Sequence, residues 1–297
     1  MKTINPKDLA TPELHALLQG AVTPRPIAFV SSISGAGEVN LSPFSFFNLF
    51  SANPPILVFS PSRRVRDNTT KHTLENVLEV PEVVIHVVGH DLVEQMSLAS
   101  TEYPKGVNEF VKAGLTAMPS NQVAPPRVKE APVAFECKVL QVFPLGDQGG
   151  AGNLVICEVI QIHLDEAILD ASGAIAPLKL DPVARLGGNW YTKVTADSLF
   201  QIPKPLTTLG IGVDLIPEEI RTSTVLSGNN LGRLANVECL PSPEELALFS
   251  AREDLEDIRR RFRLDEESYI DHLHRWAKEE LEAGNVDLAW KILLQKP

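Results

Sequence analysis

Cysteine is scarce in this sequence, and long apolar runs are missing from it. The 297 residues include three cysteines, Cys137, Cys157 and Cys239, which are widely spaced and form no CxxC pair. We therefore expect neither a disulfide framework nor a cysteine-rich metal site. Free cysteines of this kind are typical of a protein in a reducing compartment. No stretch approaches the ~20 apolar residues that cross a bilayer, and the N-terminus lacks the apolar run of a secretory signal peptide. We therefore expect a cytoplasmic protein without a membrane partner.

The common catalytic motifs are also missing. The sequence contains no HExxH motif of zinc proteases and no GxSxG motif of serine hydrolases. His272 and His274 are two residues apart on a predicted helix, so their side chains diverge and cannot easily share a metal ion. Cys137, Cys157 and His86 lie in apolar stretches, which favours inert core positions over nucleophiles or ligands. If the protein is an enzyme, a bound organic cofactor is therefore expected to supply the chemistry.

A glycine-rich run, Gly146–Gly152, has the composition of a dinucleotide-binding fingerprint but not its context. It joins two long stretches rich in Val, Ile and Phe, Val133–Phe143 and Asn153–Leu164, which we predict to be strands. A nucleotide fingerprint opens a helix, whereas this run lies between two strands. We therefore predict a hairpin loop.

The protein is acidic, with a net charge of −11, which argues against nucleic acid as a partner. One window reverses the sign, because residues 61–74 contain four Lys or Arg residues and a single Asp. A phosphate-binding site needs such a concentration of positive charge. A basic, solvated loop would have the same composition, and composition alone favours that simpler interpretation.

The segment Pro24–Thr73 contains this window, and the rest of the chain is organised around it. A predicted strand, Pro26–Ile33, is followed by a glycine-containing reversal and by an aromatic, hydroxyl-rich segment, residues 40–48. A second apolar strand, Pro55–Ser60, then leads into the basic window. A flat apolar surface beside concentrated positive charge suits a ligand with a planar ring at one end and a phosphate at the other.

Strand patterns dominate residues 24–191. Glu82–Val88 is β-branched and apolar, which predicts a buried strand, and His90–Ala99 has an apolar stripe typical of a helix. Gly35 and Gly37 are expected to adopt positive φ at the reversal. At least five strands with few interleaved helices favour a β-barrel with helical additions.

The sequence changes character after about residue 200. Residues 227–232 read as a loop, and Ser242 begins a capping box that predicts a helix. Asp265 can cap a second helix, and Val286–Leu294 forms a third amphipathic piece. We therefore divide the chain into a domain of residues 1–200 and a mostly helical C-terminal extension of residues 201–297.

Several short motifs follow one another along the first two thirds of the chain. They are Thr23–Ala28, Asn40–Asn48, Asn53–Pro55, Lys71–Thr73 with Asn76, Tyr103–Gly106 and Phe135–Lys138. In the order and spacing of these pieces, the sequence resembles the flavin reductase-like, FMN-binding split-barrel family, and in particular its flavoredoxin-type members, through about residue 195. The family's usual Lys-Asp-Thr reads Lys71-His72-Thr73 here, which keeps Lys71 and Thr73 as binding residues.

This resemblance implies a β-rich (α+β) fold, a six-stranded antiparallel split β-barrel with peripheral helices. It also implies a homodimer with FMN near the subunit interface, NADH or NADPH as the electron donor, and a small-molecule redox acceptor. The residues that it assigns to the isoalloxazine ring and ribityl chain are Ser45, Phe46, Phe47 and Asn48. Those that it assigns to the phosphate are Ser60, Ser62, Arg63, Lys71 and Thr73.

Simpler roles remain open for some of these residues. At least one of Phe44, Phe46 and Phe47 is expected to serve only as core packing, and Arg64 and Arg66 are as consistent with solvated surface charges as with ligand contacts. We hypothesise that Arg63 and Lys71 together give most of the phosphate affinity.

Three functions are compatible with the sequence. The first is an NAD(P)H-dependent flavin reductase-like oxidoreductase. The second is a non-catalytic FMN-binding electron carrier that a protein donor reduces. The third is a helical interaction module on a barrel that has lost its flavin. The extension could cap the active site, enlarge the dimer interface or dock a partner, and we favour docking onto the barrel.

Overall fold

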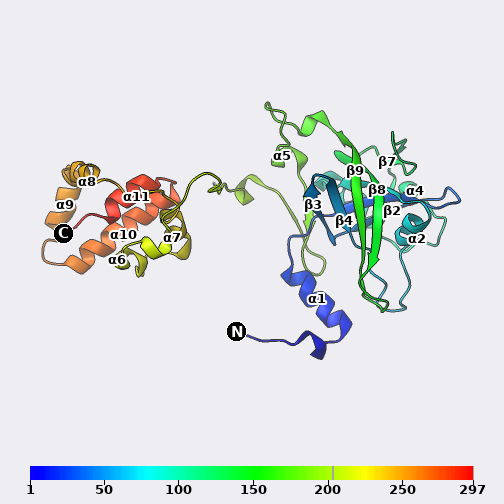
Figure 1. Cartoon of the computed structure of the whole chain (residues 1–297), viewed down its shortest axis with the longest axis horizontal. Coiled ribbons are helices and arrows are strands. Elements are labelled where there is room, and N and C mark those ends of the chain that lie inside the picture. Colours follow the sequence, from blue (N-terminus) through cyan, green and yellow to red (C-terminus); the bar gives the residue numbers. More distant parts are fainter. Residues whose placement is uncertain (203, 297) are drawn as a thin grey trace. The chain divides into compact units, whose positions relative to one another are not determined.

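The computed structural model describes residues 1–202 and 204–296. The chain divides into two compact units, Met1–Phe200 and Gln201–Pro297, and each is described by itself (Figure 1). Unit 1 contains the main β-sheet, and unit 2 is helical. In the described residues, no helix is both long and apolar enough to cross a membrane.

The main sheet of unit 1 has seven antiparallel strands, in the order β2-β1-β5-β8-β9-β4-β3. The expected number of six was wrong for this sheet, in which the aromatic segment and the residues after it form two strands. The strands are β1 (Ala28–Ile33), β2 (Val39–Phe44), β3 (Phe47–Ala52), β4 (Pro55–Phe59), β5 (Glu82–Val87), β8 (Val133–Pro144) and β9 (Asn153–Leu164).

The two edges of this sheet are joined by a very short connection. Strand β2 ends at Phe44 and β3 begins at Phe47, so only Ser45 and Phe46 lie between the first and the last strand of the order. The sheet must therefore curl until its edges approach each other, as in a barrel. The long β8–β9 hairpin predicted from the sequence belongs to this sheet, between β5 and β4 (Figure 1).

The barrel interior is filled by alternate residues of the strands. Ala28 and Val30 of β1 face this core, together with Phe44 and Phe59, whose rings are 5.2 Å apart. Phe44 is therefore a core residue, as expected for at least one of the phenylalanines. The core list is completed by Leu57, Leu74, Val77, Val83, Ile85, Cys137, Val155 and Cys157. The prediction that both cysteines are core residues is confirmed, and burial raises the pKa of the two thiols.

The first hairpin shows how local chemistry sets the turn. Gly37 has a φ of +84°, as predicted, but Gly35 does not have positive φ. The Gly35 N–H instead donates to Glu79 Oε2 at 2.9 Å, which ties the turn to helix α2 (His72–Glu79). The prediction of a positive φ at Gly35 was therefore wrong, because Gly37 alone supplies the left-handed conformation that this turn needs.

Helices and short strands surround the barrel. A second apolar cluster, which includes Phe29, Met96 and Phe110, packs between β1 and the helices of residues 90–113. The expected helix 90–99 begins as a 3-10 turn, His90–Leu92, before α3. The remaining elements are α1 (Thr11–Ala21), α3 (Val93–Leu98), α4 (Glu109–Ala113), β6 (Ala117–Met118), β7 (Arg127–Val128), α5 (Pro177–Leu180), β10 (Val183–Arg185) and β11 (Tyr191–Lys193).

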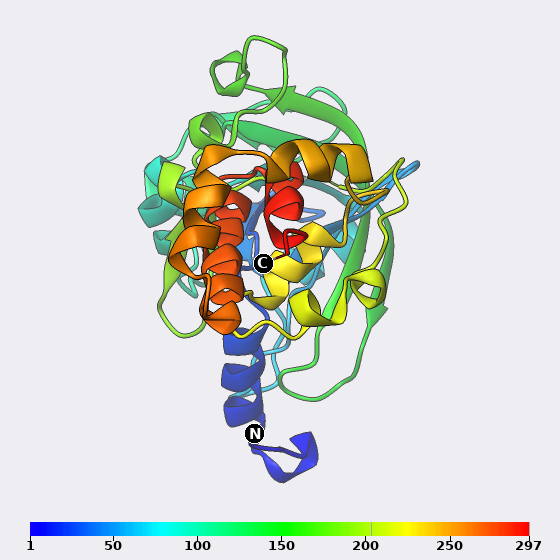
Figure 2. The same cartoon turned by 90° about the vertical axis from the view of Figure 1, so that its left-hand side faces the viewer.

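Unit 2 is built around its own apolar core. Leu255, Tyr269, Leu281 and Trp290 are buried there, and Trp290 Nε1 donates to Leu234 O at 3.0 Å. Figure 2 faces this unit, with α10 in orange and α11 in red. Its helices are α6 (Glu218–Arg221), α7 (Gly228–Leu234), α8 (Pro243–Ser250), α9 (Glu253–Arg261), α10 (Glu266–Glu282) and α11 (Val286–Leu293).

The start signals of these helices were predicted with mixed success. The Ser242 capping box is confirmed, since Ser242 Oγ accepts from Glu245 N at 3.2 Å, and Asp265 caps α10. The loop predicted at residues 227–232 was wrong, because Ser227 forms a reciprocal cap with Asn230 and opens helix α7.

Candidate functional site

A trough made of three adjoining hollows runs along unit 1. We call the hollow lined by Asn40, Ser42, Lys71, Thr73, Ser100 and Glu109 the polar end. The middle hollow is lined by Ile27, Pro43, Ser45, Met96, Arg185 and Tyr191, with Ser97 and Ser100. The open end is lined by His90, Val93, Glu94, Ser97, Tyr191, Thr192 and Lys193.

Shared lining residues show that the hollows adjoin one another. Ser100 lines both the polar end and the middle hollow. Ser97 and Tyr191 line both the middle hollow and the open end. The middle hollow and the open end have volumes of about 210 and 250 Å³, which together reach the size of small-molecule sites, roughly 300–1,000 Å³. The polar end is much narrower.

The beginning of helix α2 forms one wall of the polar end. The N–H groups of Leu74 and Glu75 donate to Lys71 O, whereas the N–H groups of His72 and Thr73 belong to the first turn, which has no intrahelical acceptor for them. The positive end of the helix dipole adds to this effect. The first turn of α2 therefore presents donors that an anion can accept.

Lys71 is the cation of the polar end. Burial and, after it, the charge of Arg64 lower the pKa of Lys71 from its usual value. Within residues 1–202 and 204–296, Lys71 makes no ion pair with a carboxylate. The carboxylate of Glu109 is buried nearby and accepts from Leu41 N at 2.9 Å, and burial raises its pKa. An anion at this end would therefore relieve the repulsion between Lys71 and Arg64.

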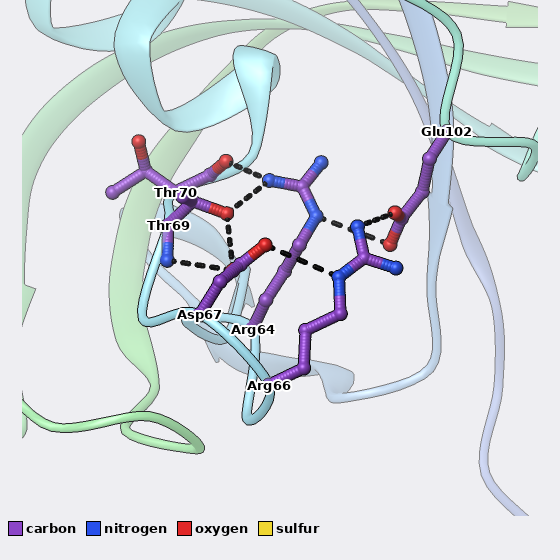
Figure 3. A network of polar contacts seen from close by, with 6 residues as sticks. All are labelled: Arg64, Arg66, Asp67, Thr69, Thr70 and Glu102. Atoms are coloured by element: carbon purple, nitrogen blue, oxygen red, sulfur yellow. Dashed lines mark hydrogen bonds and ion pairs between the residues drawn. The ribbon is translucent and has the colours of Figure 1, made fainter.

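Two arginines of the basic window, Arg64 and Arg66, are engaged in a polar network beside the polar end (Figure 3). Arg64 Nε donates to Glu102 Oε1 at 3.1 Å, and its Nη1 donates to Thr70 O at 2.5 Å. Arg66 pairs with Glu102 and with Asp67, whose pKa is lowered to about 2, chiefly by hydrogen bonds from Thr69. The two arginines of this network are balanced by two carboxylates, and Lys71 lies outside it as the cation of the polar end.

The predicted ring-binding residues are divided between two places. Ser45 lines the middle hollow. Phe46, Phe47 and Asn48 line none of the three hollows: Phe46 meets the ring of His15 edge-on, with centroids 6.0 Å apart, and Phe47 packs against the barrel core. Asn48 is exposed and accepts from Leu49 N. The structure thus places only Ser45 of this set in the trough.

The predicted phosphate-binding residues are divided in the same way. Lys71 and Thr73 meet at the polar end. Arg63 lies away from it, because its Nε donates to Asn68 Oδ1 at 2.6 Å and its Nη2 to Asn68 O at 2.7 Å. Ser60 is buried with a hydroxyl that has no hydrogen-bond partner among the described residues, and Ser62 lines none of the three hollows. The structure therefore does not bring Ser60, Ser62 or Arg63 to the trough.

Sequence reasoning missed several residues of the trough. Asn40 and Ser42 lie inside the segment of residues 40–48, whose aromatic residues are its stronger sequence signal. Arg185 and Tyr191 lie more than 100 residues further along the chain, where Gly187 and Gly188 between them are the one local signal. Their pairing across β10 and β11 brings them to the middle hollow.

Other known proteins are similar to unit 1. Residues 20–179 match the model of the "Flavin reductase like domain" family. An uncharacterized protein of Aquifex aeolicus is 41% identical over 189 residues, which are 64% of this chain and 94% of that protein.

Solved structures support the same relationship. Nitrilotriacetate monooxygenase component B of Bacillus cereus superposes with a TM-score of 0.64 at 32% identity, over 68% of this chain and 98% of its own. The 2-nitrobenzoate 2-nitroreductase NbaA of Pseudomonas fluorescens gives 0.60 at 27% identity, over 70% and 100%. The family model covers more than half of the chain, and the trough lies mostly within the matched residues. This chain therefore belongs to the flavin reductase-like domain family.

Proposed function

We propose that this protein is an FMN-dependent oxidoreductase that takes electrons from NADH or NADPH and passes them to a small-molecule acceptor. The observation that supports this proposal best is the shape and charge of the trough, which has a narrow cationic end and a wider end with an apolar wall. FMN combines an anionic phosphate with a large planar ring and fits this distribution.

The polar end would hold the phosphate. Lys71 would supply the charge, and the first-turn N–H groups of α2 would supply directional donors. The hydroxyl of Thr73 would add a hydrogen-bond donor to the phosphate. This set omits Arg63, which the sequence favoured, because the Arg63 guanidinium is engaged with Asn68. Arg64, not Arg63, is the arginine that lines the polar end.

The middle hollow would hold the ring. Ile27, Pro43 and Met96 offer an apolar wall, and Ser45 offers a hydroxyl at the junction of β2 and β3. When bound, the flavin supplies the capacity to accept a hydride and to release electrons. The side chains of the hollow bind and orient the ring, and they limit the access of water to one of its faces.

The open end provides space for a second reactant. It adjoins the middle hollow through Ser97 and Tyr191 and is lined by charged side chains, including Glu94 and Lys193. A nicotinamide or a small acceptor could reach the ring from there. The names of the similar structures, a monooxygenase component and a nitroreductase, are consistent with small-molecule redox chemistry.

We also propose that the protein is a homodimer. Strands β3, β9 and β8, which belong to one half of the sheet order, expose large apolar side chains to solvent. An exposed apolar surface of this kind on a sheet is typical of a protein interface. The exposed residues are Leu49, Phe50, Leu140, Phe143, Ile160 and Ile162.

The experiment that tests the function is an absorption spectrum of the purified protein with FMN, recorded without oxygen before and after addition of NADH or NADPH. We expect FMN to bind and to bleach with one of the two nucleotides alone. Binding without bleaching would instead support an electron carrier that needs a protein donor. A protein that does not bind FMN would contradict the proposal.

A further inference from the structure

Two arginines, Arg25 and Arg185, lie beside each other, and Arg185 lines the middle hollow. Arg25 N donates to Arg185 O and Arg185 N donates to Arg25 O, both at 2.9 Å, so the two backbones pair across an isolated bridge. Burial, and after it the neighbouring charge of Arg185, lower the pKa of Arg25 from its usual value. The fold therefore keeps two guanidinium groups close together at an electrostatic cost.

Arg25 has a structural role. Its Nη1 donates to Gln19 O at 2.5 Å and to Val22 O at 2.7 Å, and its Nη2 donates to Leu186 O at 2.9 Å. Gln19 and Val22 lie at the end of α1, where the last carbonyl groups have no partner within the helix. Arg25 thus closes the end of α1, which explains why its side chain is buried.

Arg185 is held by neutral groups. Its Nη1 donates to the Tyr191 hydroxyl at 2.7 Å, and its Nη2 donates to Gly188 O at 2.9 Å. Its Cζ lies 4.6 Å from the centre of the Tyr191 ring. Arg185 and Tyr191 are register partners in β10 and β11, and both line the middle hollow. The guanidinium is therefore fixed in position while its charge stays uncompensated.

Neither Arg25 nor Arg185 is ion-paired with a carboxylate in the part of the chain that the structure describes. In the polar network, by contrast, Arg64 and Arg66 both form ion pairs with Glu102. An immobilised arginine in a concave, partly buried site favours a ligand that brings negative charge. The phosphate of FMN has its own cation, Lys71, at the other end of the trough, so the charge that faces Arg185 is expected to belong to the ring.

Reduction of the flavin creates such a charge. The oxidised ring gains two electrons and one proton, and when the proton is on N5 the added negative charge lies around N1 and O2. We propose that Arg185 stabilises this negative charge, so that the protein binds reduced FMN more tightly than oxidised FMN and raises the midpoint potential of the bound cofactor. This inference rests on the proposed FMN site and adds a residue that tunes the cofactor.

The test is a redox titration of the full-length protein with FMN bound, with dithionite as reductant and free FMN in the same buffer as reference. We expect the midpoint potential of FMN on the wild-type protein to lie above that of free FMN. In Arg185→Gln we expect affinity for reduced FMN to fall by about tenfold relative to oxidised FMN, as for a lost charge-assisted hydrogen bond. For a two-electron couple this ratio lowers the midpoint potential by about 30 mV.

Two variants serve as controls. Arg185→Lys keeps the charge, so it should retain most of the potential of the wild type. Lys71→Ala should weaken oxidised and reduced FMN by the same factor, because the phosphate is unchanged by reduction, and should leave the potential unshifted. A lower potential in Arg185→Gln together with an unshifted one in Lys71→Ala assigns the tuning to the ring end.

Several results would overturn the inference. A wild-type potential at or below that of free FMN would do so without any variant, which matters if Arg185→Gln does not fold. Equal weakening of oxidised and reduced FMN in Arg185→Gln would reduce Arg185 to a steric or structural role. Failure of the wild type to bind FMN would refute the proposed function itself, and this inference with it, whereas binding with an unshifted potential would refute only the role of Arg185.

Discussion

Asn40 Nδ2 donates a hydrogen bond to Thr73 Oγ1 at 2.9 Å at the polar end of the trough. Asn40 lies on β2 and Thr73 in the first turn of α2, and both side chains are buried. Because the amide supplies the proton of this bond, the Thr73 hydroxyl keeps its own proton for a second acceptor. The bond therefore orients a donor beside the first-turn N–H groups of α2, where we place the phosphate.

Substitution of Thr73 by Val should weaken FMN binding by about threefold to tenfold, the usual value of one hydrogen bond. The variant should also be less stable by about 1–3 kcal/mol, because the buried Asn40 amide loses its acceptor. Thr73→Ser keeps the hydroxyl and should retain FMN affinity. Fluorescence titration with FMN and with riboflavin measures the effect, and an equal loss for riboflavin, which has no phosphate, would contradict the assignment.

Lys71 and Arg63 should behave differently when each is replaced by Ala. Lys71→Ala removes the excess charge of the polar end and should weaken FMN by about tenfold to a hundredfold. Arg63→Ala should leave FMN affinity within about twofold but lower the melting temperature, because Arg63 holds Asn68 through two hydrogen bonds. Isothermal titration and thermal unfolding separate the two effects. A large loss of affinity in Arg63→Ala would restore the sequence-based pairing of Arg63 with Lys71.

The sequence predicted the parts of the fold that depend on local pattern. The β8–β9 hairpin followed from alternating apolar runs around a glycine loop, and the buried cysteines followed from their apolar neighbours. The strands β2 and β3 were missed because Pro43, Ser45 and Asn48 interrupt the apolar pattern, and pairing with β1 and β4 decides the structure there.

The candidate site was predicted only where one segment carries its own signal. Lys71 and Thr73 lie in one short motif and meet at the polar end. Arg63 was misplaced because its neighbour Asn68, with a φ of +57°, turns the loop back so that the guanidinium binds that residue instead. Arg185 could not be placed from sequence, since its position depends on a backbone bridge to Arg25, 160 residues earlier.

His86 should make stability depend on pH. Its Nε2 accepts from Val128 N at 2.9 Å, so Nδ1 carries the proton that is donated to Phe29 O at 2.8 Å. Burial is the main reason that its pKa is lowered from 6.5 to about 4. In the unfolded chain the imidazole takes up a proton near pH 6.5, whereas in the folded chain it stays neutral until about pH 4.

The free energy of unfolding should therefore be highest above pH 6.5 and should fall between pH 6.5 and 4. Each pKa unit corresponds to about 1.4 kcal/mol, so His86 accounts for a loss of about 3 kcal/mol. Urea unfolding at several pH values measures this slope. His86→Gln should be less stable at pH 7 but should lose less stability on acidification. An unchanged slope in His86→Gln would assign the pH dependence to other groups.

A charge in the exposed apolar surface of β3 should dissociate the proposed dimer. Phe50 is 68% exposed in the single chain, so Phe50→Glu should leave the fold of the monomer intact while placing a carboxylate in the interface. Light scattering after size exclusion should change from a dimer to a monomer. Leu248→Glu is a matched control, because Leu248 is 79% exposed on α8 in unit 2. A monomeric wild type, or a dimer in Phe50→Glu, would contradict this interface.

Residues 1–200 should fold without the rest of the chain. Each described apolar cluster is drawn from a single unit, with Phe29, Phe59 and their neighbours in unit 1 and Trp290 and its neighbours in unit 2. The barrel therefore has an apolar core made of its own residues, and both ends of the trough are lined by residues of unit 1. We expect the fragment to show the circular dichroism spectrum of a β-rich protein.

The same fragment also tests whether unit 2 docks onto the barrel, as we favoured from sequence. FMN affinity should match that of the full-length protein within about twofold, since Lys71, Thr73 and Arg185 are all retained. Docking would appear instead in properties that the trough does not determine, namely a lower melting temperature, a weaker dimer or a changed turnover with NADH or NADPH. The separate fragment 201–297, added back in trans, should restore these properties if the docking is specific. Unchanged melting, dimerisation and turnover would exclude docking, and loss of FMN binding would show that the trough needs unit 2.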